Sequence, residues 1–490
     1  MRRHILALAA GAAVVVPAAA LAQARYLNPR DVAEAQRQHA ELVAELGGAE
    51  SGQRGAYVQQ VGARVAAQTG VANGAQAFRF TTLNSAVENA FAVPGGYIYI
   101  TRQLMTLLDD ESELAFVLGH EAGHVAGNHA QARKTAASRN SILGVLGAIL
   151  GSVVGNSGLG SMIGQSAMRY SQLSTLSFSR EQEYQADSLG TRYIAAAGYD
   201  PLGGTRVLAA LTRSSALERR IQGRENRSLP EWASTHPLSQ NRLQRALIEA
   251  QRSGLAASGG QRNRDQFLAM VDGMMVDDDP AQGVIDGRLF SHPDLMLQFA
   301  VPAGYQMQNG TRAVTVSGSA GQAQFRGGRY QGSLEEYIGR VVYGLTGGRQ
   351  QVAMAPPRQT VINGLPAMYS VGRANTSSGA VDVSVMAYRW SPDTVYHFVM
   401  LTRAGQGIGP FAPMVDSLRR LSAPEAAAIR PRVIDVVTVR AGDTVQSLAN
   451  LMAYRDFRME RFMALNGLTP GSRLVPGSKV KLVVYGSRRG

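Results

Sequence analysis

The sequence HEAGH, at residues 120–124, decides how the rest of the chain is interpreted. It lies in a helical pattern that begins at Asp110, and residues four apart share one face of a helix. His120 and His124 can therefore bind one zinc ion, with Glu121 beside them to polarise a metal-bound water. The pattern also fits a buried helix with two hydrogen-bonded histidines, so a third metal ligand has to be found.

A second expected helix supplies carboxylates at the same spacing. Ser179 and Gln182 form a capping box at its start, and Gly198 is suited to end it. Glu183 and Asp187 are four residues apart, so both carboxylates point to the same side. One can ligate the metal while the other holds a ligating imidazole by its second nitrogen. Taken alone, this helix would favour a different interpretation, a solvated acidic face.

Four motifs in order resemble the zinc peptidase family of the CAAX prenyl-protein endopeptidases and the bacterial heat-shock membrane proteases. They are NAFAVPGGYIYI (89–100), HEAGH (120–124), EYQAD (183–187) and HPLSQNR (236–242). The resemblance covers roughly residues 28–252 and is greatest to the soluble periplasmic branch, which handles outer-membrane proteins.

The resemblance implies a complete zinc site. One Zn²⁺ ion per chain would be held by His120, His124 and Glu183. Glu121 would act as the general base, and Asp187 would hold a ligating imidazole by its second nitrogen. The fold implied for this domain is a mainly helical, zincin-type peptidase.

Two further residues match a histidine and an arginine that face the metal in this family. His236 and Arg242 would steady the charged intermediate, or His236 would close the open metal position as a latch. Both interpretations stay open at this point. The family also has an open strand edge where this chain has Asn89–Val93, to which an extended substrate could add through backbone hydrogen bonds.

The first 22 residues are typical of a secretory signal peptide, so we expect the mature protein in the periplasm. The chain has no cysteine, which excludes disulfides and thiolate metal ligands. Its formal charge of +13 suits anionic envelope surfaces, and the sequence contains no nucleic-acid-binding motif.

The stretch 141–167 carries no charge, but it is too interrupted by glycine, serine and asparagine to predict a transmembrane helix. We expect it in the core of the peptidase domain. The alternative is a lid near the cleft that makes peripheral contact with the membrane or an apolar substrate.

Length and composition predict a multidomain α+β protein. The peptidase domain is expected at 25–252, a linker at 253–265 and a small α+β sheet domain at 266–423. The sheet domain has no clustered His, Asp or Glu, so we assign it no chemistry.

The last unit, 434–485, resembles the LysM module, a β-α-α-β fold that binds N-acetylglucosamine polymers such as peptidoglycan. The sequences GDT (442–444) and LN (465–466) carry this resemblance. They shape turns and core, so they indicate the fold better than they indicate peptidoglycan binding.

The sequence therefore predicts an exported zinc endopeptidase that hydrolyses unfolded or misassembled envelope proteins and is tethered to peptidoglycan. Two alternatives are a LysM-tethered chaperone or adaptor with a latched metal site, and a zinc hydrolase that acts on peptidoglycan.

Overall fold

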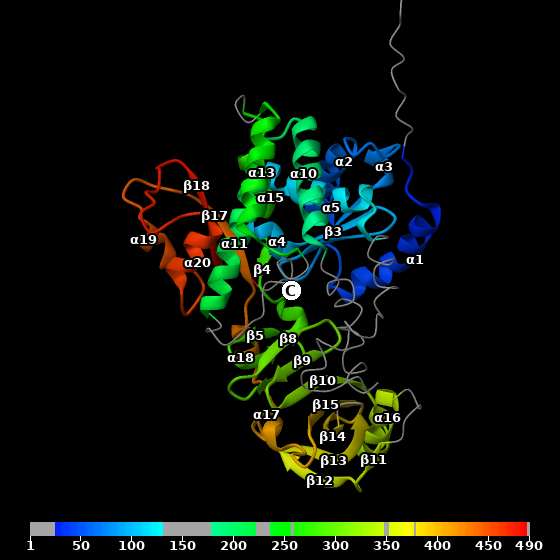
Figure 1. The fold of residues 1–490 in the computed structure, drawn as a ribbon. Helices are drawn as coiled ribbons and strands as arrows, with labels where there is room; N and C mark the ends of the chain where they lie inside the picture. The colour runs from blue at the N-terminus through cyan, green and yellow to red at the C-terminus, as the bar shows by residue number, and fades with distance from the viewer. Residues whose placement is uncertain are drawn as a thin grey trace, which may run out of the picture.

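The computed structural model describes residues 25–130, 178–221, 236–255, 259–346, 352–376 and 379–487. The predicted signal peptide and the uncharged stretch 141–167 lie outside these residues. Figure 1 shows a largely helical part at the top, the C-terminal module beside it in orange and red, and a sheet domain below. The predicted fold class, multidomain α+β, is confirmed.

The helical part is built around α5 (Glu111–Ala126), which carries the HEAGH sequence. Asp110 caps it by accepting a hydrogen bond from the Glu113 backbone nitrogen at 3.1 Å. Every residue of α5 from Glu111 to His124 is buried, because helices pack on several of its sides. The surrounding helices are α2 (Gly52–Ala66), α10 (Arg180–Ala196) and α11 (Gly203–Ile221).

Glycines let α5 and α10 approach each other closely. A Cβ atom added to Gly190 would lie 3.1 Å from the backbone nitrogen of His120, and one added to Gly119 would lie 3.5 Å from Gly190 Cα. A larger residue at Gly190 would therefore push the two helices apart. The close approach brings the HEAGH face next to the carboxylates of α10.

A three-stranded sheet lies alongside these helices in the order β1-β3-β2. β1 (Arg79–Leu83) is parallel to β3 (Tyr97–Thr101), and β2 (Ala90–Val93) is antiparallel to β3. No other described strand pairs with β2, so its outer edge keeps unpaired backbone groups. The alternation at 78–83 and the sequence that follows the turn at 94–96 predict strands at 78–83 and 97–101, and the structure confirms both.

Part of the predicted linker contacts the start of α5. Arg262 Nε donates to Asp110 Oδ2 at 2.7 Å, and Asn263 Nδ2 donates to Glu111 Oε1 at 2.9 Å. The next helix, α15 (Arg264–Val271), belongs to the core of the helical part through three residues, Phe267, Leu268 and Val271. The boundary near residue 266 remains a prediction.

The lower domain packs a large antiparallel sheet against a smaller one on one face and a helix on the other. The large sheet has the order β11-β13-β14-β15-β10-β9-β8, with β12 paired to β13. Its members are β8 (Gln306–Asn309), β9 (Val314–Gly318), β10 (Gly321–Arg329), β11 (Ala353–Met354), β12 (Arg358–Ile362), β13 (Leu365–Thr376), β14 (Gly379–Ser391) and β15 (Thr394–Arg403). The smaller sheet contains β5 (Val284–Asp286), β6 (Leu289–His292), β7 (Leu297–Ala300) and β16 (Arg419–Arg420).

The sequence predicts two helices in this domain, at 333–343 and 411–421. α16 (Leu334–Thr346) agrees with the helix predicted from Ser333, whose side chain caps it. The helix predicted at 411–421 is shorter in the structure. It is α17 (Ala412–Ser417), and Arg419 and Arg420 beyond it pair with β7 as β16. The helix therefore ends before the apolar pattern of the sequence ends, because the residues after Leu418 pair with a strand.

The C-terminal module has the predicted β-α-α-β order. Its elements are β17 (Arg432–Thr438), α19 (Val445–Ala449), α20 (Arg458–Leu465) and β18 (Lys479–Tyr485). The chain enters the lower domain after β4 (Met275–Val276) and returns as β17, and these two strands pair with each other. The module and the helical part also share one apolar core.

A buried lysine joins the module to the helical part. Lys481 of β18 is fully buried, a rare environment for a lysine. Its ammonium group lies 3.1 Å from Asp109 Oδ1 and donates to the carbonyl oxygens at the end of α4 (Arg102–Leu107) and just beyond it. These acceptors are Thr106, Leu107 and Leu108, at 2.9, 3.3 and 2.6 Å.

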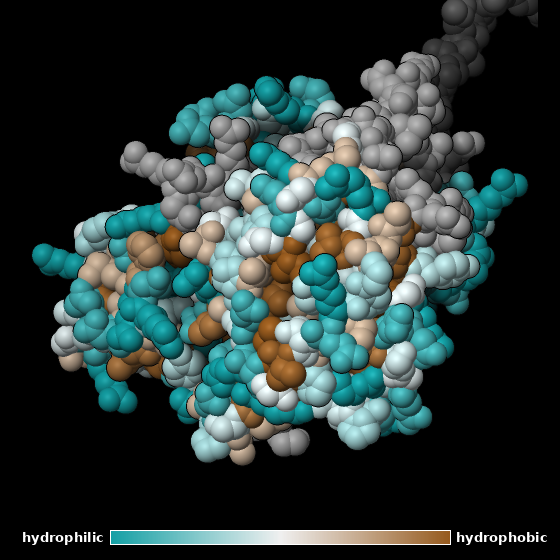
Figure 2. Space-filling model, turned by 90° about the horizontal axis from the view of Figure 1, so that it is seen from below, coloured by the Kyte–Doolittle hydropathy of each residue, from teal (hydrophilic) through white to brown (hydrophobic). Residues whose placement is uncertain are grey.

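Within the described residues, no helix has both the length and the apolar character needed to cross a bilayer. Seen from below, the surface is largely hydrophilic, with a narrow band of apolar residues (Figure 2). Exposed apolar side chains of the lower domain include Val361, which is 67% exposed. Single exposed residues of this kind are common on proteins and assign no function.

We predict that Lys481→Met lowers the free energy of unfolding by about 3–5 kcal/mol, because it removes the buried donor of three carbonyl oxygens and the cation that pairs with the partly buried Asp109. Lys479→Met is the matched control on the same strand. Lys479 pairs with the exposed Asp265 at 3.0 Å, and such surface pairs contribute about 0–1 kcal/mol. Urea denaturation of the full chain measures both effects. Equal losses of unfolding free energy in the two variants would contradict the role of Lys481 in joining the C-terminal module to the helical part.

We also predict a pH dependence of the lower domain that arises from His397. Burial, aided by the charge of Arg326, lowers the pKa of His397 to about 3, while its unfolded value is about 6.5. The folded domain therefore binds fewer protons than the unfolded chain between these values, so stability is lost as the pH falls from about 6.5 towards 3.

His397→Asn tests this dependence, because the Asn oxygen can still accept the Tyr337 hydroxyl that lies 2.8 Å from His397 Nδ1. Between pH 6 and pH 4 the wild type should lose up to about 1.4 kcal/mol per pH unit more than the variant. Urea unfolding followed by Trp390 fluorescence in a Trp232→Phe background measures the difference. If the unfolding free energies of the wild type and the variant change equally with pH, His397 is not the source of the pH dependence.

Candidate metal centre

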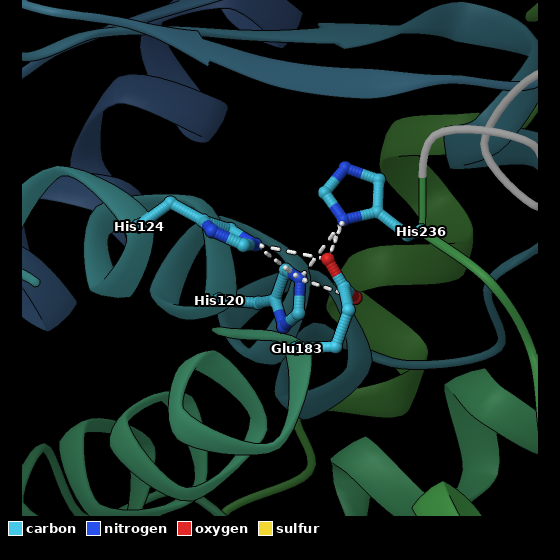
Figure 3. A group of neighbouring side chains, drawn as sticks. All are labelled: His120, His124, Glu183 and His236. Carbon is cyan, nitrogen blue, oxygen red and sulfur yellow. Dashed lines mark hydrogen bonds and ion pairs between the residues drawn. The ribbon is translucent and has the colours of Figure 1, made fainter. Parts of the chain in front are cut away.

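Four donor side chains converge beside α5. His120, His124, Glu183 and His236 each offer one nitrogen or oxygen atom, and these atoms all lie within 4.8 Å of one another. All four residues are buried. Figure 3 shows the two imidazoles of α5, the carboxylate of α10 and the His236 ring directed at a common point.

The distances between the donor atoms are short. His120 Nε2 lies 3.0 Å from His124 Nε2 and 3.3 Å from His236 Nδ1. The Glu183 carboxylate lies 2.9 Å from His236 Nδ1, 3.5 Å from His124 Nε2 and 3.6 Å from His120 Nε2. Ligands at about 2.0–2.1 Å around a tetrahedral zinc ion are themselves roughly 3.3–3.4 Å apart, so this spacing fits a single ion.

The protonation of the cluster also favours a cation. His120 Nδ1 lies 3.0 Å from Asp187 Oδ1, which places the proton on Nδ1 because a carboxylate only accepts. The His120 Nε2 atom then faces His124 Nε2 and Glu183. Burial alone would lower the pKa of His120, but the hydrogen bond to Asp187 and the charge of Glu183 outweigh it and raise that pKa. Burial lowers the pKa of His124 well below its usual value, so the His124 imidazole is neutral. Lone pairs and a carboxylate that face one another inside a protein suit a bound metal ion.

Arg242 holds the carboxylates behind the donors. Its Nε and Nη2 atoms donate to Asp187 Oδ2 and Oδ1, both at 2.8 Å, and its Nη1 lies 2.8 Å from Glu183 Oε2. Arg242 is itself buried on α13 (Gln240–Arg252). Burial alone would raise the pKa of Glu183, but the neighbouring His236, His124 and Arg242 hold it well below its usual value.

Glu121 lies next to the donors on α5 and is buried. Its Oε1 atom is 3.5 Å from His236 Nε2. The imidazole of His236 thus lies between Glu121 and Glu183, with one nitrogen near each carboxylate. His236 is therefore a fourth potential metal donor beside His120, His124 and Glu183.

The structure brings all seven predicted site residues into one cluster. Three observations refine their interpretation. Arg242 contacts the carboxylates of Asp187 and Glu183, which gives it a positioning contact that the sequence did not predict. His236 reaches the donors themselves. Asp187 lies behind His120, as expected from its spacing relative to Glu183.

Sequence reasoning missed the contact made by His129. A helical projection places it away from the metal face, yet its Nδ1 lies 2.8 Å from His124 Nδ1 and its Nε2 lies 3.0 Å from Gln185 Oε1. The reason is that α5 ends at Ala126 and Asn128 has a left-handed backbone (φ 54°), so the projection does not apply beyond that point. The available signal was Asn128 directly after Gly127, the residue that caps the C-terminus of α5.

Comparison with known proteins agrees with this geometry. Residues 52–250 match peptidase family M48. This stretch is an M48 peptidase domain. Residues 437–483 match the LysM domain, so both predicted resemblances are confirmed, as is the enzyme class at the level of the family. The His-His-Glu cluster of the M48 domain implies a bound metal ion.

Curated relatives of the M48 domain come from bacteria and from mitochondria. The beta-barrel assembly-enhancing protease of Yersinia pestis is 32% identical over 199 residues, which cover 40% of this chain and 38% of the relative. Its Escherichia coli K12 counterpart is 30% identical over a stretch that covers 38% of this chain and 37% of the relative. The mitochondrial metalloendopeptidase OMA1 of Schizosaccharomyces pombe is 28% identical over a stretch that covers 40% of this chain and 53% of the relative. The chain thus spans about two fifths of the bacterial relatives.

We predict that Asp187→Asn weakens metal binding about 10- to 100-fold, because it removes the charge that orients His120. Competition with a chromophoric zinc chelator measures this affinity. Glu181→Gln, an exposed change on the same helix, is the control and should leave the affinity unchanged. Equal affinities for the Asp187 variant and the control would exclude this supporting role.

Proposed function

We propose that this protein is a zinc-dependent endopeptidase of the bacterial envelope that cleaves unfolded or misassembled proteins. The observation that carries the proposal is the buried convergence of His120, His124 and Glu183 with Glu121 beside them. The expected signal peptide supports a periplasmic location. The names of the bacterial relatives support substrates among outer-membrane proteins.

Each residue has a proposed chemical role. His120, His124 and Glu183 would hold zinc, which when bound supplies a Lewis acid and a water of pKa about 7. Glu121 accepts a proton from the attacking water and then delivers it to the leaving amine. Arg242 and Asp187 keep Glu183 and His120 oriented, so no reorganisation of these groups is needed during hydrolysis.

The edge of β2 is the proposed place for the polypeptide. An extended chain can add to an open strand edge through backbone hydrogen bonds, which are independent of side-chain identity. Phe91, Ala92 and Val93 on β2 are only half-buried, so side chains of the added strand have surface to contact. This mode suits unfolded proteins, which expose extended backbone, better than it suits a folded partner or a glycan.

His236 is the proposed latch of the site. A catalytic zinc ion needs one coordination position for water or substrate, and His236 Nδ1 lies within the donor cluster. We therefore favour displacement of His236 before each cleavage over a role in stabilising the intermediate. A permanently latched chaperone or adaptor would have the same resting geometry, and catalysis separates the two.

We predict that Glu121→Gln retains one zinc ion per chain but lowers kcat/KM about 10²- to 10⁴-fold, because general-base catalysis contributes that much. Cleavage of an unfolded, fluorescently labelled casein measures the rate, and elemental analysis measures the zinc. Glu181→Gln serves again as the control. Wild-type activity in the Glu121 variant would contradict the assignment of the base, and a zinc-loaded wild type that cleaves no polypeptide would contradict the proposed function.

The LysM domain is proposed to bind peptidoglycan and so to hold the peptidase near the cell wall. Because this domain shares a core with the M48 domain, such binding would fix the orientation of the cleft as well as its location. The structure offers no separate donor cluster for glycan hydrolysis among the described residues.

A further inference from the structure

A cavity of about 420 Å³ lies between the M48 and LysM domains, next to the residues that precede β2. The M48 wall includes Glu88, Leu107 and Ser214, and the LysM wall includes Tyr454, Arg461 and Leu465. Its lining is thus partly apolar, with charged groups at separate points. Neither the metal centre nor its supporting residues line this cavity.

The acidic group of the cavity is Glu88. Ser214 Oγ donates to Glu88 Oε2 at 2.7 Å, while Oε1 is shielded from solvent and has no hydrogen-bond partner among the described residues. Burial, reinforced by the charge of Glu218, raises the pKa of Glu88 to about 7. An added cation beside the Glu88 carboxylate would therefore be stabilised, because it would offset the burial of this carboxylate and relieve the repulsion from Glu218.

The other charged groups of the cavity have partners of their own. Arg461 lies over the Tyr454 ring, 4.1 Å from its centre, and 3.9 Å from the Asp456 carboxylate. Asp277 forms an ion pair with Arg432 at 2.8 Å and accepts a hydrogen bond from the Tyr454 hydroxyl at 3.0 Å. Glu218 also lines the cavity and has an interaction of its own, so Glu88 is the acid best suited to take an external cation.

The cavity has a fixed position relative to the edge of β2. Glu88 comes two residues before Ala90, the first residue of the strand. Asn89, between them, is held to Thr101 of β3 by backbone and side-chain hydrogen bonds of 2.9–3.1 Å. A polypeptide paired with β2 that continues past Ala90 would pass over residues 86–88, which line the cavity.

We propose that this cavity is a substrate subsite that takes a lysine or arginine side chain of the extended polypeptide, and that the LysM domain forms one of its walls. The apolar lining would contact the methylene groups of that side chain, and Glu88 would pair with its charged end. The inference rests on the proposed endopeptidase function and specifies its substrate.

The wall supplied by the LysM domain is rigidly held. Lys481 fixes β18 against the end of α4, and β17 pairs with β4 at the floor of the cavity. Val276 of β4 and Val483 of β18 both line it. The LysM domain would thus contribute to peptide selection independently of any glycan it binds.

Peptide binding to the full-length, zinc-loaded Glu121→Gln protein tests the proposal without turnover. The probes are labelled ten-residue peptides of neutral sequence in which one lysine, or norleucine as its uncharged counterpart, is moved along the chain. Fluorescence anisotropy should reveal one position at which lysine binds about tenfold more tightly than norleucine, the gain of a single charge-assisted hydrogen bond.

Glu88→Gln in the same background should abolish this lysine preference while norleucine binding is retained, because glutamine can still accept from Ser214. Glu335→Gln, an exposed change on α16, is the matched control and should keep the preference. Ala464→Phe, which fills the cavity from the LysM side, should also remove it. A preference that survives both cavity variants, or no lysine preference at any position, would overturn the proposal.

The outcomes for the two proposals are distinguishable. If the wild type cleaves unfolded casein but shows no basic preference, the subsite is wrong and the endopeptidase function stands. If the zinc-loaded wild type neither cleaves casein nor binds any peptide, both are wrong.

Discussion

The close contact between α5 and α10 is the constraint on which the rest of the structure depends. Gly190 allows the two backbones to meet closely, because a Cβ atom at this position would crowd the backbone nitrogen of His120 at 3.1 Å. Only at this separation does Glu183 reach the imidazoles of α5, and Asp187 the far side of His120. The buried charges are tolerable because Arg242 satisfies both carboxylates from α13.

The three parts of the chain are less independent than their sequence signatures suggest. Lys481, a LysM residue, has its acceptors in the M48 domain, and the LysM sheet takes its third strand from the segment before the lower domain. A separate module on a flexible linker could bind peptidoglycan but could not shape a peptide cavity. Because the LysM domain shares a core with the M48 domain, the proposed peptidoglycan binding and the proposed cavity wall are compatible in one LysM domain.

Much of the site was predictable because its residues occupy regular helices, where spacing converts directly into geometry. The pairs at 120/124 and 183/187 are examples, and the capping residues Asp110 and Ser179 located both helices. His129 and the contacts of Arg242 were not predictable in this way. They depend on where a helix stops and on how α13 packs, and such tertiary features leave little trace in local spacing. Glu88 escaped notice because it lies just before the motif at 89–100 and has no titratable partner at helical or strand spacing; only the fold places it at a cavity.

The pairing of β4 with β17 has an evolutionary consequence. Val276 and Arg432 face each other across two antiparallel strands, so the whole lower domain occupies the position of a hairpin turn. An ancestor with a short turn there would have kept the same peptidase and LysM core. The inserted domain could then be gained, lost or exchanged without rebuilding the peptidase and LysM core.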